Sequence, residues 1–232
     1  MPVLVAAGVC AAAWSTAGST VGGVDVRLVD LALDDRAVAA AEQSLTPAEL
    51  ARARRGAPAV HRRRVLLRAA LRAALGVELG MDPARVPLAT TPAGRPFVAS
   101  SVAGARVDVS CSASGSLGLV AVGRGCRIGV DVEQVAAWSP DVLEESWLSD
   151  SERRALTDLR VADRAVAATR SWTHKEAILK GGGTGLRADP AAIVTAVGRT
   201  DGVVAGWQIH DVPVPHGWVA GLAVAPEKEI GS

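Results

Sequence analysis

The sequence repeats itself weakly, and this repeat is the feature that most restricts the fold. Three short patterns occur twice in the same order: a G-V-D-V tetrapeptide, a helix-start pattern, and a histidine followed by a basic residue. They lie at 23–26 and 129–132, at 45–49 and 148–152, and at 61–62 and 174–175. Ordered recurrence indicates a repeated structural unit. We therefore expect two similar halves, with a boundary between residues 105 and 106.

Hydrophobic periodicity predicts a strand followed by helices in the first half. Residues 24–29 alternate and are rich in valine, as expected of a strand. Thr46 precedes Pro47, and Glu49 stands three positions after Thr46, which is the pattern of a capping box at a helix start. A longer helix is predicted over residues 60–75, ending at a glycine.

The second half shows similar signals. Residues 117–122 and 127–132 read as strands joined by a G-R-G hairpin turn. Ser149 caps a helix with Glu152 at its third position, and a helix of about twenty residues is expected over 161–180. Further strands are expected at 193–197, 206–210 and 218–224. The predicted fold is α+β, a pseudo-dimer of two similar subdomains (1–105 and 106–232), each a small antiparallel sheet packed with helices.

Composition excludes several classes of protein. The chain has 232 residues, of which 49% are hydrophobic and 21% charged, so it can bury a core. It has no apolar run of the ~18 residues that a membrane span requires. The net charge of +1 gives no support for nucleic-acid binding. Three cysteines without metal-ligand spacing, and an apolar start without basic residues, favour a cytoplasmic protein with reduced thiols.

The first candidate site is the segment from Ile128 to Glu133. In a strand, residues two apart point the same way, so Asp131 and Glu133 share one face. Two neighbouring carboxylates repel unless a cation lies between them, and Mg²⁺ binds one or two carboxylates together with water and phosphate. The alternative is a solvated polar face of an amphipathic strand.

The second candidate site is W-T-H-K-E-A-I-L-K at residues 172–180. On a helix, Trp172, Glu176 and Leu179 lie along one side. A carboxylate on a mostly apolar side needs a partner if it is buried. The alternative is a surface ion pair between Glu176 and Lys180.

The third candidate is a run of arginines without intervening acids. Such a block repels itself unless solvent or an anion compensates it. The lack of aromatic residues counts against single-stranded nucleic acid, so a polyphosphate, an acidic protein or simple solvation remain. The run comprises Arg52, Arg54, Arg55, Arg62, Arg63, Arg64, Arg68 and Arg72.

Together these segments resemble the surfactin-type 4'-phosphopantetheinyl transferases. Residues 129–133 are similar to the family's G-[IV]-D-[IV]-E, and residues 172–180 to its W-[ST]-x-K-E-[AS]-x-x-K. Residues 94–96 and 109–112 resemble its G-K-P and [IV]-S-H-S. The resemblance implies a two-lobed fold and Mg²⁺-dependent transfer of phosphopantetheine from coenzyme A (the co-substrate) to a serine of an acyl or peptidyl carrier protein. The leaving group is 3',5'-ADP, as in a holo-[acyl-carrier-protein] synthase.

The resemblance also implies residue roles. Asp131, Glu133 and Glu176 would hold Mg²⁺ between the lobes. Glu176, or a metal-bound water, would take the serine proton. The catalytic set is Asp131, Glu176 and Lys180. The first lobe (1–105) would supply contacts to the phosphates of coenzyme A, and the second lobe (106–232) would supply the acidic motifs and the groove for the carrier. The residues expected to contact coenzyme A are Arg63, Arg95, Ser110, Cys111, Lys175 and Lys180.

Two departures from symmetry and family pattern matter. In the first half, Asp25 is the equivalent of Asp131, but Arg27 replaces the second acid, so we expect one metal site. Cys111 replaces the family's histidine, and a neutral thiol donates only weakly. This predicts weaker binding of coenzyme A or compensation by an arginine. It also motivates one alternative, a catalytically weakened coenzyme A- or carrier-binding homologue. A further alternative, which the pair Asp131 and Glu133 permits, is another Mg²⁺-dependent phosphotransferase.

The expected partners are coenzyme A and acidic apo carrier proteins, with no nucleic acid and no membrane. The carriers would serve fatty acid, polyketide or nonribosomal peptide synthesis, a choice that the sequence leaves open. Trp138 and Trp147 line the carrier groove or pack in the core. Because both lobes lie in one chain, a monomer suffices.

Overall fold

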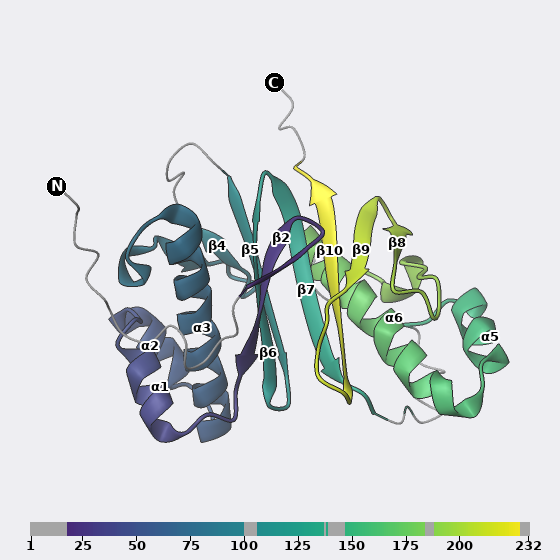
Figure 1. Cartoon of the computed structure of the whole chain (residues 1–232), viewed down its shortest axis with the longest axis horizontal. Coiled ribbons are helices and arrows are strands. Elements are labelled where there is room, and N and C mark those ends of the chain that lie inside the picture. Colours follow the sequence, from purple (N-terminus) through teal and green to yellow (C-terminus); the bar gives the residue numbers. More distant parts are fainter. Residues whose placement is uncertain (1–17, 100–105, 137, 139–146, 184–187, 228–232) are drawn as a thin grey trace.

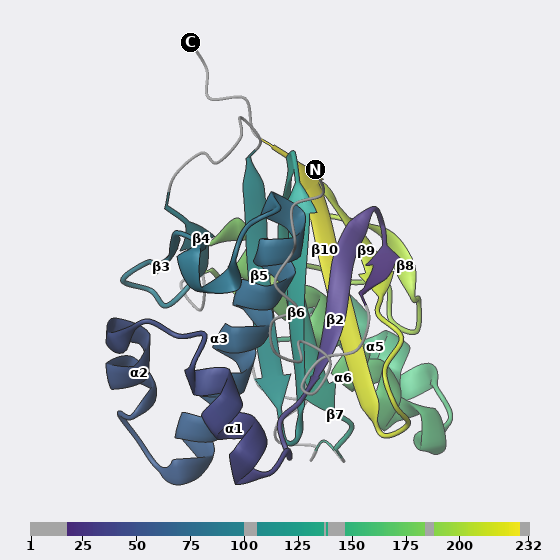
Figure 2. The same ribbon diagram turned by 60° about the vertical axis from the view of Figure 1, so that its left-hand side comes forward.

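The computed structural model describes residues 18–99, 106–136, 138, 147–183 and 188–227. Two antiparallel four-stranded sheets face each other in the middle, and helices cover their outer sides (Figure 1). In the view of Figure 2, helix α3 (Pro58–Leu79) lies across the outer side of the first sheet, and α6 (Val161–Gly182) lies behind the strands. The mixture of helices and antiparallel sheets confirms the predicted α+β class.

The first sheet has the strand order β1-β2-β6-β5. Its outer side packs against α3, and α1, α2 and the 3₁₀ helix η1 pack against α3 in turn. Strands β3 and β4 form a separate hairpin, and β4 contacts β5. The bounds are β1 Ser19–Val21, β2 Val24–Asp30, α1 Asp35–Glu42, α2 Pro47–Ala53, η1 Pro83–Arg85, β3 Leu88–Thr90, β4 Pro96–Val98, β5 Val107–Ser114 and β6 Leu117–Arg124.

The second sheet has the order β7-β10-β9-β8, and α6 packs against β7 and β10. Between the sheets lies an apolar core that includes Val26, Leu119, Val130 and Leu222. The bounds are β7 Cys126–Gln134, α5 Asp150–Asp158, η3 Pro190–Ala192, β8 Asp201–Val204, β9 Trp207–Asp211 and β10 Trp218–Pro226. No helix in the described ranges is long and apolar enough to cross a membrane.

The strand pairing corrects one expectation about the middle of the chain. Strands β5 and β6 belong to the first sheet, so the change of sheet lies at the β6–β7 turn, while the lobe boundary between residues 105 and 106 stays a prediction. The predicted hairpin of β6 with β7 is wrong. Strand β6 has β2 on one edge and β5 on the other, so no edge remains for β7, which pairs with β10.

Two predicted element ends also differ. Helix α3 continues through Gly76, where a Cβ atom would stand 2.9 Å from the carbonyl oxygen of Met81, so this glycine permits a close approach and does not end the helix. The helix ends at Leu79, and its cap is Gly80, whose φ is 63°. Residues 193–197 form no strand. The apolar start of the chain, residues 1–13, lies outside the described residues.

Both halves contain a capping-box glutamate that also binds a buried cation of the long helix. Glu49 caps α2 and accepts from Arg72, while Glu152 caps α5 and accepts from Lys175. The two partners are 23 positions apart in each half. This spacing aligns Lys175 with Arg72 and replaces the proposed pairing of the two histidines. Descent of the halves from one unit stays a prediction.

The Lys175 ammonium is fully buried, with a side-chain exposure of 0%. It donates to Glu152 Oε2 at 2.7 Å and to the carbonyl oxygens of Trp147 and Pro190. Burial by itself would raise the pKa of Glu152, but hydrogen bonds, chiefly from Lys175 and Thr195, outweigh it and hold that pKa below its ordinary value. This ion pair fixes α5 and the segment after α6 to the long helix.

We therefore predict that Lys175→Met destabilises the protein by about 3–5 kcal/mol, because it leaves Glu152 buried and unpaired. Urea unfolding measures the change. The double variant Lys175→Met, Glu152→Gln is the matched control and should recover part of the loss. A single variant that loses less than about 1 kcal/mol would contradict a structural role for this pair.

Candidate functional site

The site exists because α6 lies unusually close to β7. A Cβ atom on Gly129 of β7 would stand 1.9 Å from the carbonyl oxygen of Ala177 and 2.4 Å from the amide nitrogen of Gly181. On β10, a Cβ on Gly221 would stand 2.8 Å from the His174 ring. Glycine at both strand positions lets the helix backbone approach the sheet directly. The glycine of the G-V-D-V-E motif is thus a packing residue, because it allows α6 to lie directly against the acidic strand.

Asp131 is the buried centre of the site, with a side-chain exposure of 2%. Its Oδ1 atom accepts hydrogen bonds from Lys180 Nζ at 2.6 Å and from Ser112 Oγ at 2.7 Å. Its Oδ2 atom is buried without a hydrogen-bond partner in the described part of the chain. Burial raises the pKa of Asp131 in spite of the opposing Lys180 charge.

The other two predicted carboxylates lie within electrostatic reach of Asp131. Glu133 accepts hydrogen bonds from Ser114 and from Trp172, and burial raises its pKa. Burial also raises the pKa of Glu176, and the charges of Asp131 and Glu133 raise it further, while Lys180 lowers it. The predicted apolar face of β7 is confirmed, since Ile128, Val130 and Val132 are fully buried between the sheets.

The described residues contain no ready-made group of three acidic, histidine or cysteine side chains that could hold a metal ion. Two carboxylate oxygens nevertheless lack partners there, Asp131 Oδ2 and Glu176 Oε1, and both are buried. Mg²⁺ is commonly held by one or two protein carboxylates, with water and substrate phosphate completing its shell. The two unpartnered oxygens therefore fit such an ion. Participation of Glu133 stays a prediction.

A polar seam joins the two sheets beside the site. β5 and β7 are edge strands of different sheets, and side chains of β5 accept hydrogen bonds from backbone N–H groups of β7. The acceptors Asp108, Ser110 and Ser114 serve Ile128, Val130 and Gln134, respectively. Ser110 is buried in this seam, and its expected phosphate contact stays a prediction. In the sequence, the alternation of polar residues along 108–114 is the signal for this row of acceptors.

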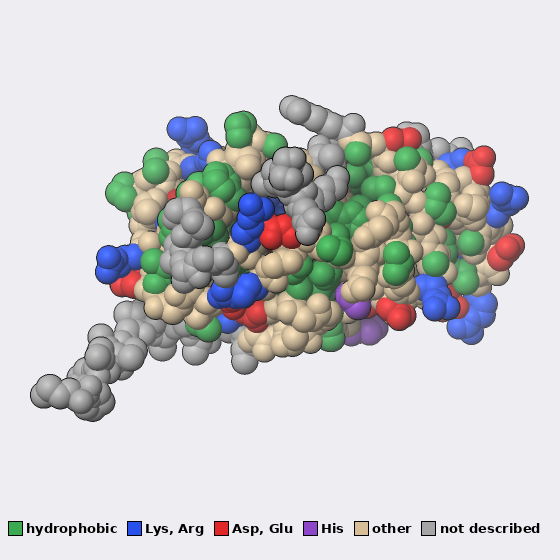
Figure 3. Space-filling model, turned by 90° about the horizontal axis from the view of Figure 1, so that it is seen from above, with side chains coloured by type: hydrophobic (Ala, Val, Ile, Leu, Met, Phe, Trp, Pro, Cys, Tyr) green, Lys and Arg blue, Asp and Glu red, His purple; other side chains and the backbone are tan. Residues whose placement is uncertain are grey.

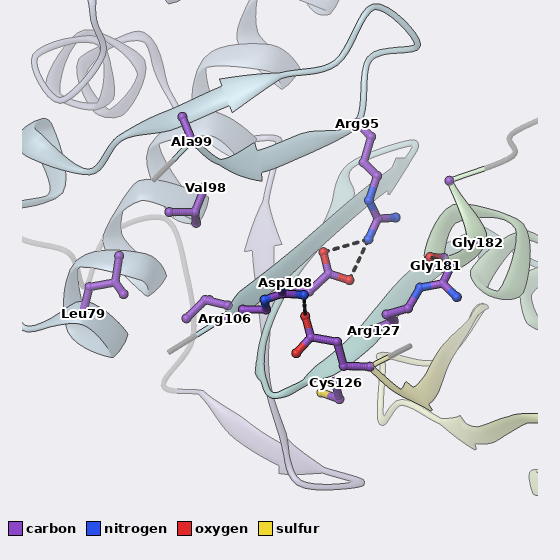
Figure 4. A pocket seen from close by; sticks show the side chains of 13 residues that line it. Leu79, Arg95, Val98, Ala99, Arg106, Asp108, Cys126, Arg127, Gly181 and Gly182 are labelled. Atoms are coloured by element: carbon purple, nitrogen blue, oxygen red, sulfur yellow. Dashed lines mark hydrogen bonds and ion pairs between the residues drawn. The ribbon is translucent and has the colours of Figure 1, made fainter. Parts of the chain in front are cut away.

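Arg95 reaches across the seam from the first half. Its Nη2 atom donates to both Asp108 oxygens at 2.8 and 2.9 Å and to the Ile128 carbonyl, and its Nη1 atom donates to the Lys180 carbonyl. Arg95 also lines a cavity of about 520 Å³ at the end of α6, shown in Figure 4. Residues that line this cavity include Arg106, Arg127 and Gly181, but not the three carboxylates.

The cavity has a mixed electrostatic character. Arg106 pairs with Glu227 at 2.7 Å, and Arg127 donates to the Gly181 carbonyl and lies over the Trp207 ring. The view from above in Figure 3 likewise shows basic side chains next to acidic ones left of the centre of this face. An anion in this cavity would thus bind only to those guanidinium N–H groups that are not already used in these contacts.

The remaining predicted contacts lie in different surroundings. Arg63 is exposed on α3, whereas Lys175 is buried in the structural ion pair, and its expected contact with coenzyme A stays a prediction. Burial raises the pKa of Cys111, while Lys180, Arg68 and Arg95 oppose that rise. The charges of these three cations thus act on the thiol, and compensation for the missing histidine stays a prediction.

Half of the arginine run makes contacts within the protein. Arg68 and Arg72 pair with Glu49, and Arg62 and Arg64 donate to backbone carbonyls. The exposed members are Arg52, Arg54, Arg55, Arg63 and Arg64.

The tryptophans favour core packing over a groove. The three rings form one cluster in tilted and edge-to-face contacts, with ring centroids 5.0–6.4 Å apart, and Trp147 is buried. The cluster consists of Trp138, Trp147 and Trp172. The alternative of a surface ion pair between Glu176 and Lys180 is not found in the described part of the chain, where Lys180 binds Asp131.

The raised pKa of Glu176 predicts a dependence of stability on pH. Because its folded-state pKa lies above the ordinary value, ionisation of Glu176 destabilises the fold as the pH rises through this interval. In metal-free buffer, Glu176→Gln should therefore unfold at a higher temperature than wild type at about pH 8, and the difference should shrink toward about pH 5. Glu78→Gln, at a surface glutamate paired with Arg124, is the control. Equal midpoints at both pH values would contradict the prediction.

Comparison with known proteins supports one family. No curated protein matches the chain. Residues 127–211, from β7 to the end of β9, match the family model of the 4'-phosphopantetheinyl transferase superfamily. The matched segment contains Asp131, Glu133, Glu176 and Lys180, and this match supports placing it in the 4'-phosphopantetheinyl transferase superfamily.

Proposed function

We propose that this protein is an enzyme that transfers 4'-phosphopantetheine from coenzyme A to a serine of an apo acyl or peptidyl carrier protein and releases 3',5'-ADP. The observation that carries the proposal is the meeting of the two acidic motifs, one on β7 and one on α6, inside the matched segment. Transfer of a phosphate-linked group needs charge neutralisation and positioning, and clustered carboxylates around a cation are suited to this.

In this proposal Asp131 and Glu176 hold Mg²⁺ through their unpartnered oxygens, with Glu133 beside them. When bound, the ion would neutralise the diphosphate of coenzyme A. Glu176 is our candidate to accept the serine proton, because its raised pKa favours proton uptake. Lys180 would bind the phosphate that leaves.

The nucleotide end of coenzyme A would lie on the first-half side of the seam. Arg95 and the arginine-lined cavity beside it support this, as does the exposed Arg63 of α3. Since Arg95 already shares its charge with Asp108, it would orient a phosphate rather than supply the whole counter-charge. We further propose the surfactin-type subfamily, a cytoplasmic monomer and an acidic carrier that docks on the second half.

Intact-mass measurement of apo carriers tests the proposal. With Mg²⁺ and coenzyme A, at least one of a panel of fatty acid, polyketide and peptidyl carriers should gain the mass of phosphopantetheine. Asp131→Asn should slow this by about 100-fold or more, since it removes a charge-stabilising group. Asp25→Asn, in the matching motif of β2, is the control and should retain activity. No mass gain on any carrier with several divalent metals would contradict the proposal.

Cys111 favours a second candidate, a homologue that binds coenzyme A or a carrier without efficient turnover. Its half-buried thiol, whose pKa is raised, is a poor replacement for a charged donor. Calorimetric binding of coenzyme A in the absence of any carrier mass gain would favour this candidate. Turnover at rates ordinary for enzymes would exclude it.

A further inference from the structure

One ammonium group binds Asp131 and acts through its charge on the other two carboxylates of the site. Lys180 Nζ donates to Asp131 Oδ1 at 2.6 Å and to Ser112 Oγ at 2.8 Å, and Ser112 in turn donates to the same Asp131 oxygen. The three groups thus form a closed triangle. The Lys180 charge also acts on Glu133 and Glu176.

The triangle uses one side of the Asp131 carboxylate and leaves the other open. Oδ1 has two donors, whereas Oδ2 has none in the described part of the chain. A divalent ion on Oδ2 would share one carboxyl group with the ammonium on Oδ1. Two cations on one carboxylate repel each other, most strongly where burial limits solvent screening.

Lys180 can leave this position more easily than the other groups. Its side chain is 31% exposed, in contrast to 2% for Asp131, and lysine has a flexible stem with a rotatable donor head. It needs another anion to turn to, because an unpaired ammonium beside buried groups is unfavourable. A diphosphate that arrives with the metal ion would provide that anion.

We propose that Lys180 is the resident counter-cation of the acidic site and couples two ligands: it opposes a divalent ion that binds alone, and it moves to the diphosphate when both bind together. This inference rests on the proposed function, and it adds that binding of the metal ion and binding of coenzyme A depend on each other. The metal ion and coenzyme A would bind with positive coupling, each tightening the other by the same factor. Ser112 acts as a positioning residue that holds Asp131 Oδ1 toward Lys180.

Titration calorimetry of the full chain at pH 8, without a carrier, tests this. Mg²⁺ is titrated alone and with saturating coenzyme A. For wild type we expect coenzyme A to tighten Mg²⁺ binding about tenfold or more. Lys180→Met should bind Mg²⁺ alone about tenfold more tightly than wild type, and coenzyme A should then tighten it less.

Three further variants make the result specific. Lys180→Gln also lacks the charge and should behave like Lys180→Met, so it replaces that variant if Met prevents folding. Lys180→Arg keeps the charge and should resemble wild type. Arg124→Met removes an exposed cation paired with Glu78, outside the site, and should leave the Mg²⁺ affinity unchanged.

The outcomes separate this inference from the proposed function. If the folded, charge-free variants bind Mg²⁺ alone no more tightly than wild type, the counter-cation role of Lys180 is overturned, whatever coenzyme A does. If coenzyme A binds neither wild type nor Lys180→Arg under any condition, the proposed function fails, while tighter Mg²⁺ binding by the charge-free variants would still support the counter-cation role.

Discussion

The close contact between α6 and β7 is the constraint on which the rest of the site depends. Acidic groups on β7 and on α6 can approach each other because Gly129 has no side chain to hold the helix away. The cost of this arrangement is visible in the raised pKa values of Asp131, Glu133 and Glu176. Burial raises these pKa values because it disfavours charged carboxylates, and shifted pKa values of this kind cluster at functional sites.

The second requirement is a rigid junction between the two sheets. An apolar core fills the space between them, and the side chains of β5 satisfy the open backbone edge of β7. Arg95 extends this junction from the first half to the end of α6. Because unpaired edge groups are costly when buried, the polar seam both closes the edge and fixes the strand that carries Asp131.

Local signals in the sequence were sufficient for the elements that carry the chemistry. The capping boxes at Thr46 and Ser149, and the alternation from Ile128 to Glu133, depend on neighbouring residues and appear in the structure as predicted. Strand pairing is different, because the turn after β6 resembles a hairpin although both edges of β6 are already occupied. Such competition between distant strands leaves no mark on the local pattern.

The partners of charged side chains could not be predicted from neighbouring residues in the sequence either. Helical spacing pointed Lys180 at Glu176, but the approach of α6 to β7 gives it Asp131 instead. Lys175 stands one position before Glu176, yet faces Glu152 in the core. Two adjacent motif residues thus have separate tasks, one in holding the helix and one in the acidic site, and only the packing of α5 distinguishes them.

The central claim is that the acids of β7 and α6 bind a single divalent ion. Crystals grown with Mn²⁺ and coenzyme A test it most directly through anomalous scattering. The account predicts one manganese peak in contact with Asp131 and Glu176, with Lys180 moved from Asp131 to a phosphate oxygen. Coenzyme A bound without manganese at these carboxylates, or manganese bound only elsewhere, would contradict it.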